Sequence, residues 1–285
     1  MSTLKIALQK SGRLSEDSLS LLKKCGLAIE SENGELKARV ANFPLEILFL
    51  RNSDIPQYLM DGVADLAIIG QNLLFEKGFP IATVMPLGFS KCRVAVAVPK
   101  AFPFTSMQDL NGLRIATSYP ETTNRYFKSQ NIAMELHQIS GSVEIAPNIG
   151  LADAIVDIVS SGNTLAKNNL KEVAVILESE AVLAVSPKIK PESKVTMDRL
   201  LFRLQSVLRA SQSKYLMMNV PNSKIKEISQ LLPVLKSATV VPLSLEGWSS
   251  LQTVISETAF WDVIDKLKAS GAQDILVCPI EKIAL

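Results

Sequence analysis

Before residue 210 the chain alternates short apolar runs with segments in which apolar residues recur every three or four positions. The short runs, rich in β-branched residues, predict strands. These strands are Leu4–Leu8, Leu45–Leu50, Asp65–Gly70, Arg93–Val98, Leu113–Thr117, Asp153–Val159, Glu172–Leu177 and Ala181–Val185. The segments with helical periodicity predict helices. These helices are 15–25, 54–60, 121–130, 165–170 and 195–210. Such alternation favours an α/β body with largely parallel sheets.

The last quarter of the chain has a different pattern. Strands are predicted at Tyr215–Val220, Thr239–Leu245, Leu251–Ser256 and Asp274–Ile280, with helices at 222–232 and 257–269. The order β-α-β-β-α-β is that of a ferredoxin-like unit. The unit contains no catalytic constellation, so we expect it to serve regulation or assembly, with a purely structural oligomerisation domain as the alternative.

Composition narrows the classes of function. The 285 residues exceed one typical domain, and 47% hydrophobic content suffices for more than one core. The net charge of +2 lacks the electrostatic footprint of a nucleic-acid-binding protein. No apolar run approaches ~20 residues, so we expect no membrane span, and the chain enters its first strand without a long apolar leader.

Cysteine and histidine are too scarce for the common metal and nucleophile sites. Cys25, Cys92 and Cys278 lie far apart, which disfavours zinc sites and disulfides and fits a reducing cytoplasm. His137 is the sole histidine, lies in a strand-like stretch and is predicted to be structural. A catalytic triad could not be built without it.

The most informative stretch is Gly141–Leu165, in which a buried strand is followed by Ser-Ser-Gly-Asn-Thr and a short apolar helix. A loop of small residues that leads into a helix exposes backbone N–H groups and forms an anion cradle. Asp153 and Asp157 share one face of the strand about 13 Å apart, because a strand rises ~3.3 Å per residue. Asp157, at the loop end, is the better candidate for binding ribose hydroxyls or Mg²⁺. The alternative is a buried strand with an ordinary turn.

Three other turns are candidate parts of a site. Gln9–Arg13 contains two cations and a glycine at a strand end, where α/β proteins place substrates. Gly70, at the end of another strand, would let a ligand approach the backbone. Ser118 and the N–H groups after it could form a second anion site, and Tyr119 could stack on a purine. Each turn could instead be an ordinary solvated loop or packing residue.

Several separated motifs resemble the long form of ATP phosphoribosyltransferase, the first enzyme of histidine biosynthesis. They are LQKSGRL at 8–14, DIPQYLMDGVADLAIIGQNLL at 54–74, RIATSYP at 114–120, GSVEIAP and DAIVDIVSSGNTL within 141–165, KYLMM at 214–218 and CPIEK at 278–282. They follow the family's order and run nearly end to end.

The resemblance implies a fold and domain limits. It implies a two-lobed catalytic body like type II periplasmic binding proteins and a C-terminal ferredoxin-like (ACT/PII-like) βαββαβ regulatory domain. Lobe I would comprise residues 1–88 and 182–208, lobe II residues 89–181, and the regulatory domain residues 211–285.

The resemblance also implies the reaction and its site. N1 of ATP would attack C1 of the ribose in phosphoribosyl pyrophosphate (PRPP), releasing pyrophosphate and forming N1-(5-phosphoribosyl)-ATP. The implied catalytic residues are Asp157, Glu144, Lys10 and Arg13. The implied PRPP-binding residues are Asp157, Ser160, Ser161, Gly162, Asn163 and Thr164, and the implied ATP-binding residues are Gly12, Arg51, Gly70 and Tyr119. Classical phosphoribosyltransferase loops follow paired acids, whereas Asp157 stands alone here, as it does in the family resembled.

By the same resemblance, Mg²⁺ would be bound mainly through substrate phosphates, with Glu144 as a protein ligand. Histidine would inhibit through the last domain, with Leu235 and Thr239 as candidate effector residues. The protein would be a cytoplasmic homo-oligomer, a hexamer built from dimers, with no separate regulatory subunit and no nucleic-acid or membrane partner.

Two hypotheses of other classes compete with this one. A periplasmic-type binding protein would need an export signal and no Asp157 cradle. A regulatory or assembly protein would lack a coherent anionic site in its body.

Overall fold

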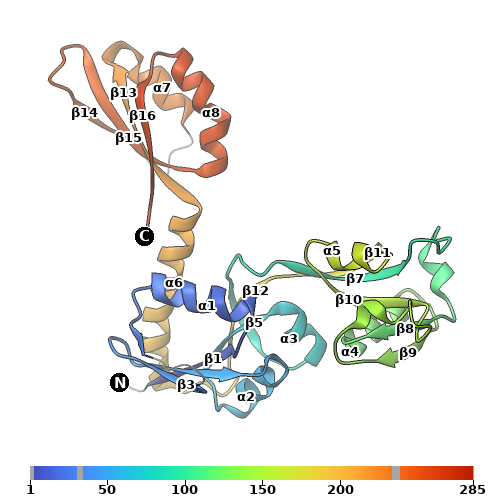
Figure 1. The fold of residues 1–285 in the computed structure, drawn as a ribbon. Coiled ribbons are helices and arrows are strands. Elements are labelled where there is room, and N and C mark those ends of the chain that lie inside the picture. The colour runs from blue at the N-terminus through green and yellow to red at the C-terminus, as the bar shows by residue number, and fades with distance from the viewer. Residues whose placement is uncertain (1–2, 31–34, 233–237, 285) are drawn as a thin grey trace. The chain divides into compact units, whose positions relative to one another are not determined.

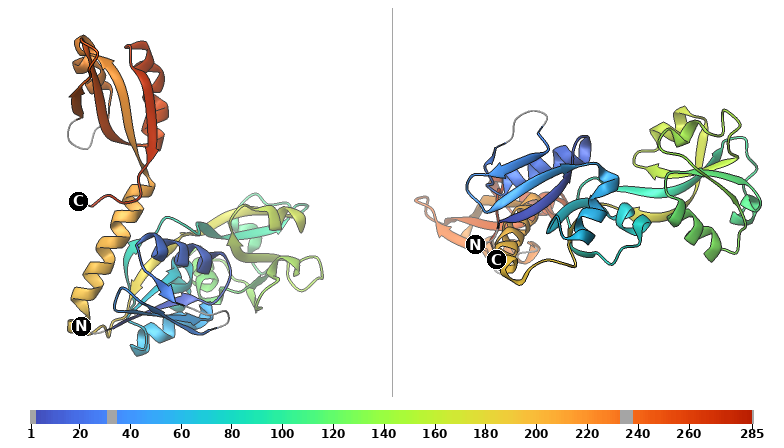
Figure 2. Two further views of the ribbon diagram at one scale, coloured as in Figure 1. Left: turned by 60° about the vertical axis from the view of Figure 1, so that its left-hand side comes forward. Right: turned by 90° about the horizontal axis from the view of Figure 1, so that it is seen from below.

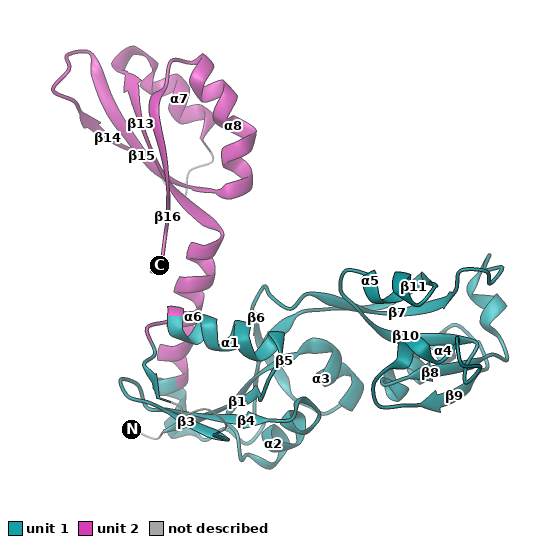
Figure 3. Ribbon diagram, viewed as in Figure 1, with its two compact units in different colours: residues 1–23, 27–196 teal, residues 24–26, 197–285 magenta. Residues whose placement is uncertain are grey.

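The computed structural model describes residues 3–30, 35–232 and 238–284 (Figure 1). The chain divides into two compact units, residues 1–23 with 27–196, and residues 24–26 with 197–285 (Figure 3). The sequence predicted that the body ends at residue 208, whereas this division falls between residues 196 and 197. The predicted limits of the lobes and of the last domain stay a prediction.

The first sheet of unit 1 has seven strands in the order β2-β3-β4-β1-β5-β12-β6. Their bounds are β1 Leu4–Gln9, β2 Ile29–Glu30, β3 Lys37–Val40, β4 Leu45–Leu50, β5 Leu66–Gly70, β6 Ala82–Pro86 and β12 Ala181–Val185. Strand β1 pairs in parallel with β4 and β5 at the centre, and the outer pairs are antiparallel. The central strands are buried on both faces, as their continuous apolar runs predicted.

Three helices accompany this sheet: α1 Arg13–Lys24, α2 Ile55–Asp61 and α3 Gln71–Lys77. Pro56 lies in the first turn of α2, where its missing N–H costs nothing. Gly62 ends α2 at φ +74°, a left-handed conformation that glycine adopts without strain. Helix α3 was not predicted, because its seven residues are too few to show a clear period.

The second sheet of unit 1 has five strands in the order β11-β7-β10-β8-β9. Their bounds are β7 Cys92–Pro99, β8 Arg114–Thr117, β9 Glu135–Gln138, β10 Ala154–Val159 and β11 Leu170–Ser179. The helices of this lobe are α4 Pro120–Ser129 and α5 Asn163–Lys167. The chain therefore passes between the two sheets twice, after β6 and after β11, which gives the two-lobed body expected.

Two details of the prediction for the body were wrong. The sheets are mixed rather than largely parallel, because β7, β11 and β12, which lead the chain from one sheet to the other, pair antiparallel to their neighbours. Helix α5 begins at Asn163, earlier than expected, because the loop glycine already serves as its N-cap, and Leu170 belongs to β11.

The last domain follows α6 Lys194–Ser211. Its elements are β13 Ser213–Pro221, α7 Ile225–Leu231, β14 Thr239–Pro242, β15 Trp248–Ser256, α8 Glu257–Ala269 and β16 Gln273–Pro279. The strand order β14-β15-β13-β16 is antiparallel throughout and confirms the predicted ferredoxin-like unit. Helices α7 and α8 cover one face of the sheet (Figure 2, left) and enclose a core around Leu216, Leu251 and Phe260.

Candidate active site

Asp157 lies on β10, half-buried, two residues before the strand ends. Burial raises the pKa of its carboxyl to about 6. The backbone N–H of Ile158 donates to this carboxyl and opposes the rise in pKa, whereas the nearby charge of Glu144 adds to the rise. A carboxyl with this pKa holds its proton more tightly than a solvent-exposed aspartate. It releases the proton readily when a cation or cationic substrate centre arrives.

Glu144 comes from a separate segment, the 3₁₀ turn Val143–Ile145. Ser118 holds the chain just before this turn, because its hydroxyl donates to the carbonyl of Ile139 at 2.9 Å and accepts from the N–H of Gly141 at 3.4 Å. The fold thus brings a second acid to Asp157 from outside the loop motif. The two carboxylates form an electronegative centre suited to a cation or a developing positive charge.

The loop Ser160–Thr164 follows directly. Gly162 adopts φ +79° and is the N-cap of α5. Among the described residues, the N–H groups of Gly162 and Thr164 have no hydrogen-bond acceptor. These unsatisfied donors at a turn with left-handed backbone make an anion-binding concavity.

Arg93, on β7, braces this loop. Its Nη1 donates to the carbonyl of Ser160 at 3.2 Å, while its Nε and Nη2 bond to both carboxylate oxygens of Glu172 at 2.7 and 2.6 Å. This bond raises the pKa of the guanidinium further above its ordinary value. The pair was not predicted, because nothing in the sequence links residues 79 positions apart before the strands are paired.

The candidate residues of lobe I share one edge of the first sheet. Lys10 follows β1, Arg51 follows β4 and Gly70 ends β5, and these three strands are parallel neighbours. The N–H of Lys10 bonds to the carbonyl of Leu50 at 2.8 Å, which holds the two cationic turns together. Lys10 and Arg51 are exposed and can meet an anion.

The turn between Lys10 and α1 is open as well. Gly12 has φ +91°, which reverses the chain before the helix. Arg13 lies 3.9 Å from Asp17 with most of its side chain in solvent, so this ion pair restrains it little.

Gly70 does more than open a path to the backbone. A Cβ on Gly70 would meet the side-chain oxygen of Asn72 at 2.4 Å. Asn72 in turn donates to the hydroxyl of Tyr119 in lobe II at 3.2 Å. Any side chain at position 70 would therefore have to displace the Asn72 side chain, with or without a ligand in the site.

The N-terminus of α4 does not form the second anion site that we predicted from Ser118 and the residues after it. The carboxylate of Glu76, from α3, accepts from the N–H groups of Glu121 at 3.0 Å and Thr122 at 2.8 Å. A buried internal carboxylate already occupies the place of the anion. That prediction was wrong because the partner lies 45 residues away in the chain.

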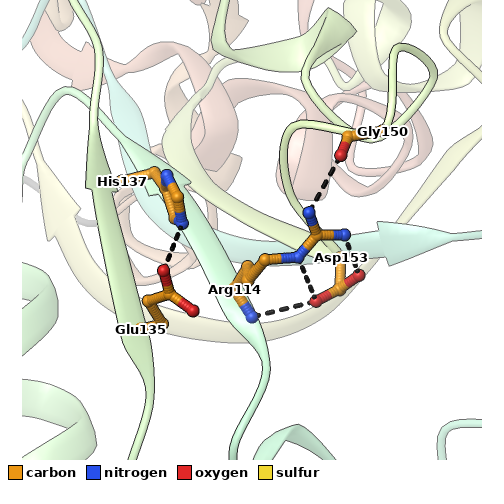
Figure 4. Close-up of polar contacts among 5 residues, drawn as sticks. All are labelled: Arg114, Glu135, His137, Gly150 and Asp153. Atoms are coloured by element: carbon orange, nitrogen blue, oxygen red, sulfur yellow. Dashed lines mark hydrogen bonds and ion pairs between the residues drawn. The ribbon is translucent and has the colours of Figure 1, made fainter.

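His137 and Asp153 lie outside the site and are shown in Figure 4. Asp153 receives two hydrogen bonds from the guanidinium of Arg114, at 3.1 and 2.8 Å, and one from its backbone N–H at 3.0 Å. These bonds lower the pKa of Asp153, with Arg114 the main cause. His137 lies 3.1 Å from Glu135. The Arg114–Asp153 contacts join β8 to the residue just before β10, whereas the His137–Glu135 contact lies within β9.

Of the candidate metal and effector residues, Glu144 and Thr239 are among the described residues. Within the described ranges no three His, Cys, Asp or Glu residues cluster as a metal site. Thr239 is exposed at the start of β14, whereas Leu235 lies outside the described residues. Among the described helices none has the length and apolarity to cross a bilayer.

Comparison with known proteins decides the family. The family model for ATP phosphoribosyltransferase matches residues 51–206, and the model for the C-terminal domain of the same family matches residues 210–282. The chain belongs to the ATP phosphoribosyltransferase family. This confirms the resemblance noted in the sequence and makes the protein a transferase of histidine biosynthesis.

Members of the ATP phosphoribosyltransferase family resemble the chain over its whole length. The enzyme of Cytophaga hutchinsonii is 54% identical over 284 residues, 99% of both chains, and that of Bacteroides fragilis is 47% identical over 282 residues, 99% of this chain and 100% of its own. A solved ATP phosphoribosyl transferase (HisG:HisZ) complex from Thermotoga maritima contains a chain that is 32% identical with a TM-score of 0.64. The match covers 98% of that chain and 72% of this one.

Proposed function

We propose that the protein transfers the phosphoribosyl group of PRPP to N1 of ATP, releasing pyrophosphate and forming N1-(5-phosphoribosyl)-ATP. The observation that carries this proposal is the pair of carboxylates, Asp157 and Glu144, beside an open loop of unsatisfied N–H groups. Family membership makes the donor and acceptor the expected ones.

The loop Ser160–Thr164 would bind the 5-phosphate of PRPP. Free N–H groups and the glycine turn match a phosphate that carries nearly two charges, and a backbone donor loses no side-chain entropy on binding. Asp157, at the base of the loop, would accept hydrogen bonds from the ribose hydroxyls. The 5-phosphate and the ribose would thereby be oriented by adjacent residues of one strand and loop.

The rate would come from positioning and electrostatics. As pyrophosphate leaves, C1 of the ribose becomes cationic, and the negative charge of Asp157 and Glu144 stabilises that cation. Lys10, Arg13 and Arg51 would neutralise the phosphate groups of the two substrates, while Gly12 and Tyr119 frame the ATP. No side chain needs to form a covalent intermediate, which agrees with the absence of a nucleophile–histidine pair among the described residues.

Mg²⁺ fits this donor set. Hard cations with oxygen ligands are bound by one or two carboxylates together with substrate phosphates, and Glu144 with Asp157 provides the carboxylates. When bound, the ion would neutralise the pyrophosphate as it leaves. The residues of the chain would hold the ribose and exclude water from C1.

The last domain would bind histidine as a feedback inhibitor and would join copies of the chain into a cytoplasmic dimer and hexamer. Thr239 lies exposed on the edge strand β14, followed by the exposed apolar residues Val240 and Val241. Leu276 and Val277 are exposed on the opposite edge strand β16. Apolar side chains on both edges of a small sheet favour association with another copy. Since this domain is part of the chain, no separate regulatory subunit would be needed.

The test is the absorbance of purified protein mixed with ATP, PRPP and Mg²⁺, with pyrophosphatase present and absent, followed by added histidine. Product should form only with all three reactants, and histidine should suppress it. Formation that histidine leaves unchanged would retain the transferase and reject the regulatory assignment. Absence of product in the complete mixture would reject the reaction, and light scattering of the same sample would report the number of copies.

A further inference from the structure

Helix α3 contacts lobe II through a buried asparagine. Asn72 is 5% exposed. Its backbone N–H donates to the hydroxyl of Ser179 at 2.9 Å, and that hydroxyl donates back to Asn72 Oδ1 at 3.0 Å. Both groups are buried, so each needs the other as a partner. The side-chain oxygen is thus committed to Ser179, and the amide nitrogen must face the other way.

That nitrogen faces the phenol of Tyr119. Asn72 Nδ2 donates to the hydroxyl oxygen at 3.2 Å. A phenol keeps its proton near the ring plane, on one of two sides. A donor on one side leaves the other side for the proton. Among the described residues no acceptor takes this proton. Asp157 lies near the phenol, because its charge is the second cause, after burial, of the raised pKa of Tyr119.

A second residue of α3 fixes the backbone of Tyr119. Glu76, four residues after Asn72 and on the same face of the helix, accepts the N–H groups of Glu121 and Thr122 just beyond Tyr119. Tyr119 itself is the N-cap residue of α4, and its N–H donates to the hydroxyl of Thr117 at 2.8 Å. Both ends of the tyrosine are therefore held, and Asn72 controls the hydroxyl end.

Gly70 completes this arrangement. Its φ of −69° is open to any residue, so the glycine is not needed for its backbone angle. It is needed for space, because the first carbon of any side chain would lie 2.4 Å from the Asn72 oxygen. A side chain at position 70 would push the asparagine away from Ser179 and Tyr119.

We propose that Asn72 is a positioning residue of the transferase site. Asn72 holds the Tyr119 phenol so that the phenol hydroxyl donates a hydrogen bond to an oxygen of the substrate bound beside Asp157. This inference rests on the proposed function. It assigns Gly70 the role of making room for Asn72 rather than for a ligand.

A double-mutant cycle tests the coupling, with the transferase assay as readout. Asn72→Ala and Tyr119→Phe should each lower kcat about tenfold, the effect of one hydrogen bond made in the transition state. The double variant should be no slower than Tyr119→Phe, because the proposal has Asn72 affect the reaction only through the phenol hydroxyl. Effects that multiply in the double variant would overturn the proposal. Asn111→Ala, which removes an amide bonded to the N–H of Ala133 in lobe II, is the control and should leave kcat unchanged.

Gly70→Ala provides an independent arm. In the wild-type background it should lower kcat as Asn72→Ala does, and in the Asn72→Ala background it should have no further effect, since the clashing oxygen is gone. An equal loss in both backgrounds would mean that a ligand needs the space at Gly70 and would contradict the proposal. If the wild-type protein forms no product, the proposed function fails. If the wild type is active but the effects of Asn72→Ala and Tyr119→Phe multiply, only the role of Asn72 is rejected and the proposed function stands.

Discussion

Arg93 and Glu172 form a bidentate ion pair whose closest contact, Nη2 to Oε2, is 2.6 Å, and Arg93 also donates to the carbonyl of Ser160 at the start of the proposed phosphate loop. The pair joins β7 to β11 on one side of β10. Its partners are 29% and 25% exposed, so water screens it only in part. If the loop binds phosphate with its backbone, as proposed, such an anchor favours binding, because unanchored donors lose entropy when the ligand arrives.

Arg93→Met should therefore raise the KM for PRPP roughly threefold to tenfold, with a smaller effect on kcat. PRPP saturation curves at fixed ATP measure this change. Arg114→Met is a matched control, because Arg114 and Asp153 make a similar bidentate pair in the same sheet, 40% and 34% exposed, away from the loop. The control should lower Tm comparably and leave the KM for PRPP unchanged. An equal rise in KM for both variants would mean that Arg93 stabilises the fold and has no specific effect on PRPP binding.

Asp157→Asn should abolish most activity and leave the fold intact, because Asn cannot supply the negative charge that, in the proposed reaction, stabilises the cationic ribose. Circular dichroism and the transferase assay measure the two effects. Wild-type activity in this variant would remove Asp157 from the site.

The same substitution should change the dependence of stability on pH. The pKa of Asp157 is about 6 in the folded protein, above its ordinary value of 3.8, so the folded state binds this proton more tightly than the unfolded state. Stability from this group is present at low pH and is lost as pH rises through about 6. The Tm of Asp157→Asn relative to wild type should therefore increase between about pH 4 and pH 7.

Asp153→Asn is the control of opposite sign, at the residue just before the same strand. Arg114 lowers the pKa of Asp153, so its contribution is present at neutral pH and is lost as pH falls below the ordinary value. The deficit in Tm of this variant should shrink on acidification. Parallel pH trends for the two variants would contradict the assignment whose expected sign is not observed.

Gly162→Ala should destabilise the protein by about 1–2 kcal/mol, the cost of a left-handed conformation for a residue with Cβ, and should also raise the KM for PRPP. Gly162→Val should do so more strongly, because a branched side chain crowds the loop. Gly150→Ala is the matched control, since Gly150 has φ +74° and open space around it but lies outside the loop. Urea denaturation and PRPP saturation separate the two effects. A similar KM for the Gly162→Ala and Gly150→Ala proteins would exclude the loop from phosphate binding.

Thr239→Val should weaken inhibition by histidine without changing kcat, because it removes an exposed hydroxyl from the proposed effector site. Histidine titrations of the transferase assay measure the change. Thr258→Val, an exposed threonine at the start of α8 in the same domain, should leave inhibition unchanged. If both variants are inhibited like wild type, the effector site lies elsewhere in the domain.

The sequence alone determined much of this protein. Apolar runs and helical periods lie within single segments, so β1, β4, β5, β10 and the βαββαβ order of the last domain were predicted within a few residues of their observed bounds. The loop at Ser160–Thr164 and its acid Asp157 were proposed as site residues in the same way, because strand, loop and helix are consecutive. The motifs around them sufficed to recognise the family.

Only the tertiary structure decided which distant residues meet. It placed Glu144 near Asp157, joined Arg93 to Ser160 and Glu172, and filled the N-terminus of α4 with Glu76. It also showed that Gly70 makes room for Asn72, whose partners lie 107 and 47 residues away. Hydrogen bonds between distant residues leave no periodic trace in a sequence, because each depends on two side chains that the pairing of strands and lobes brings together.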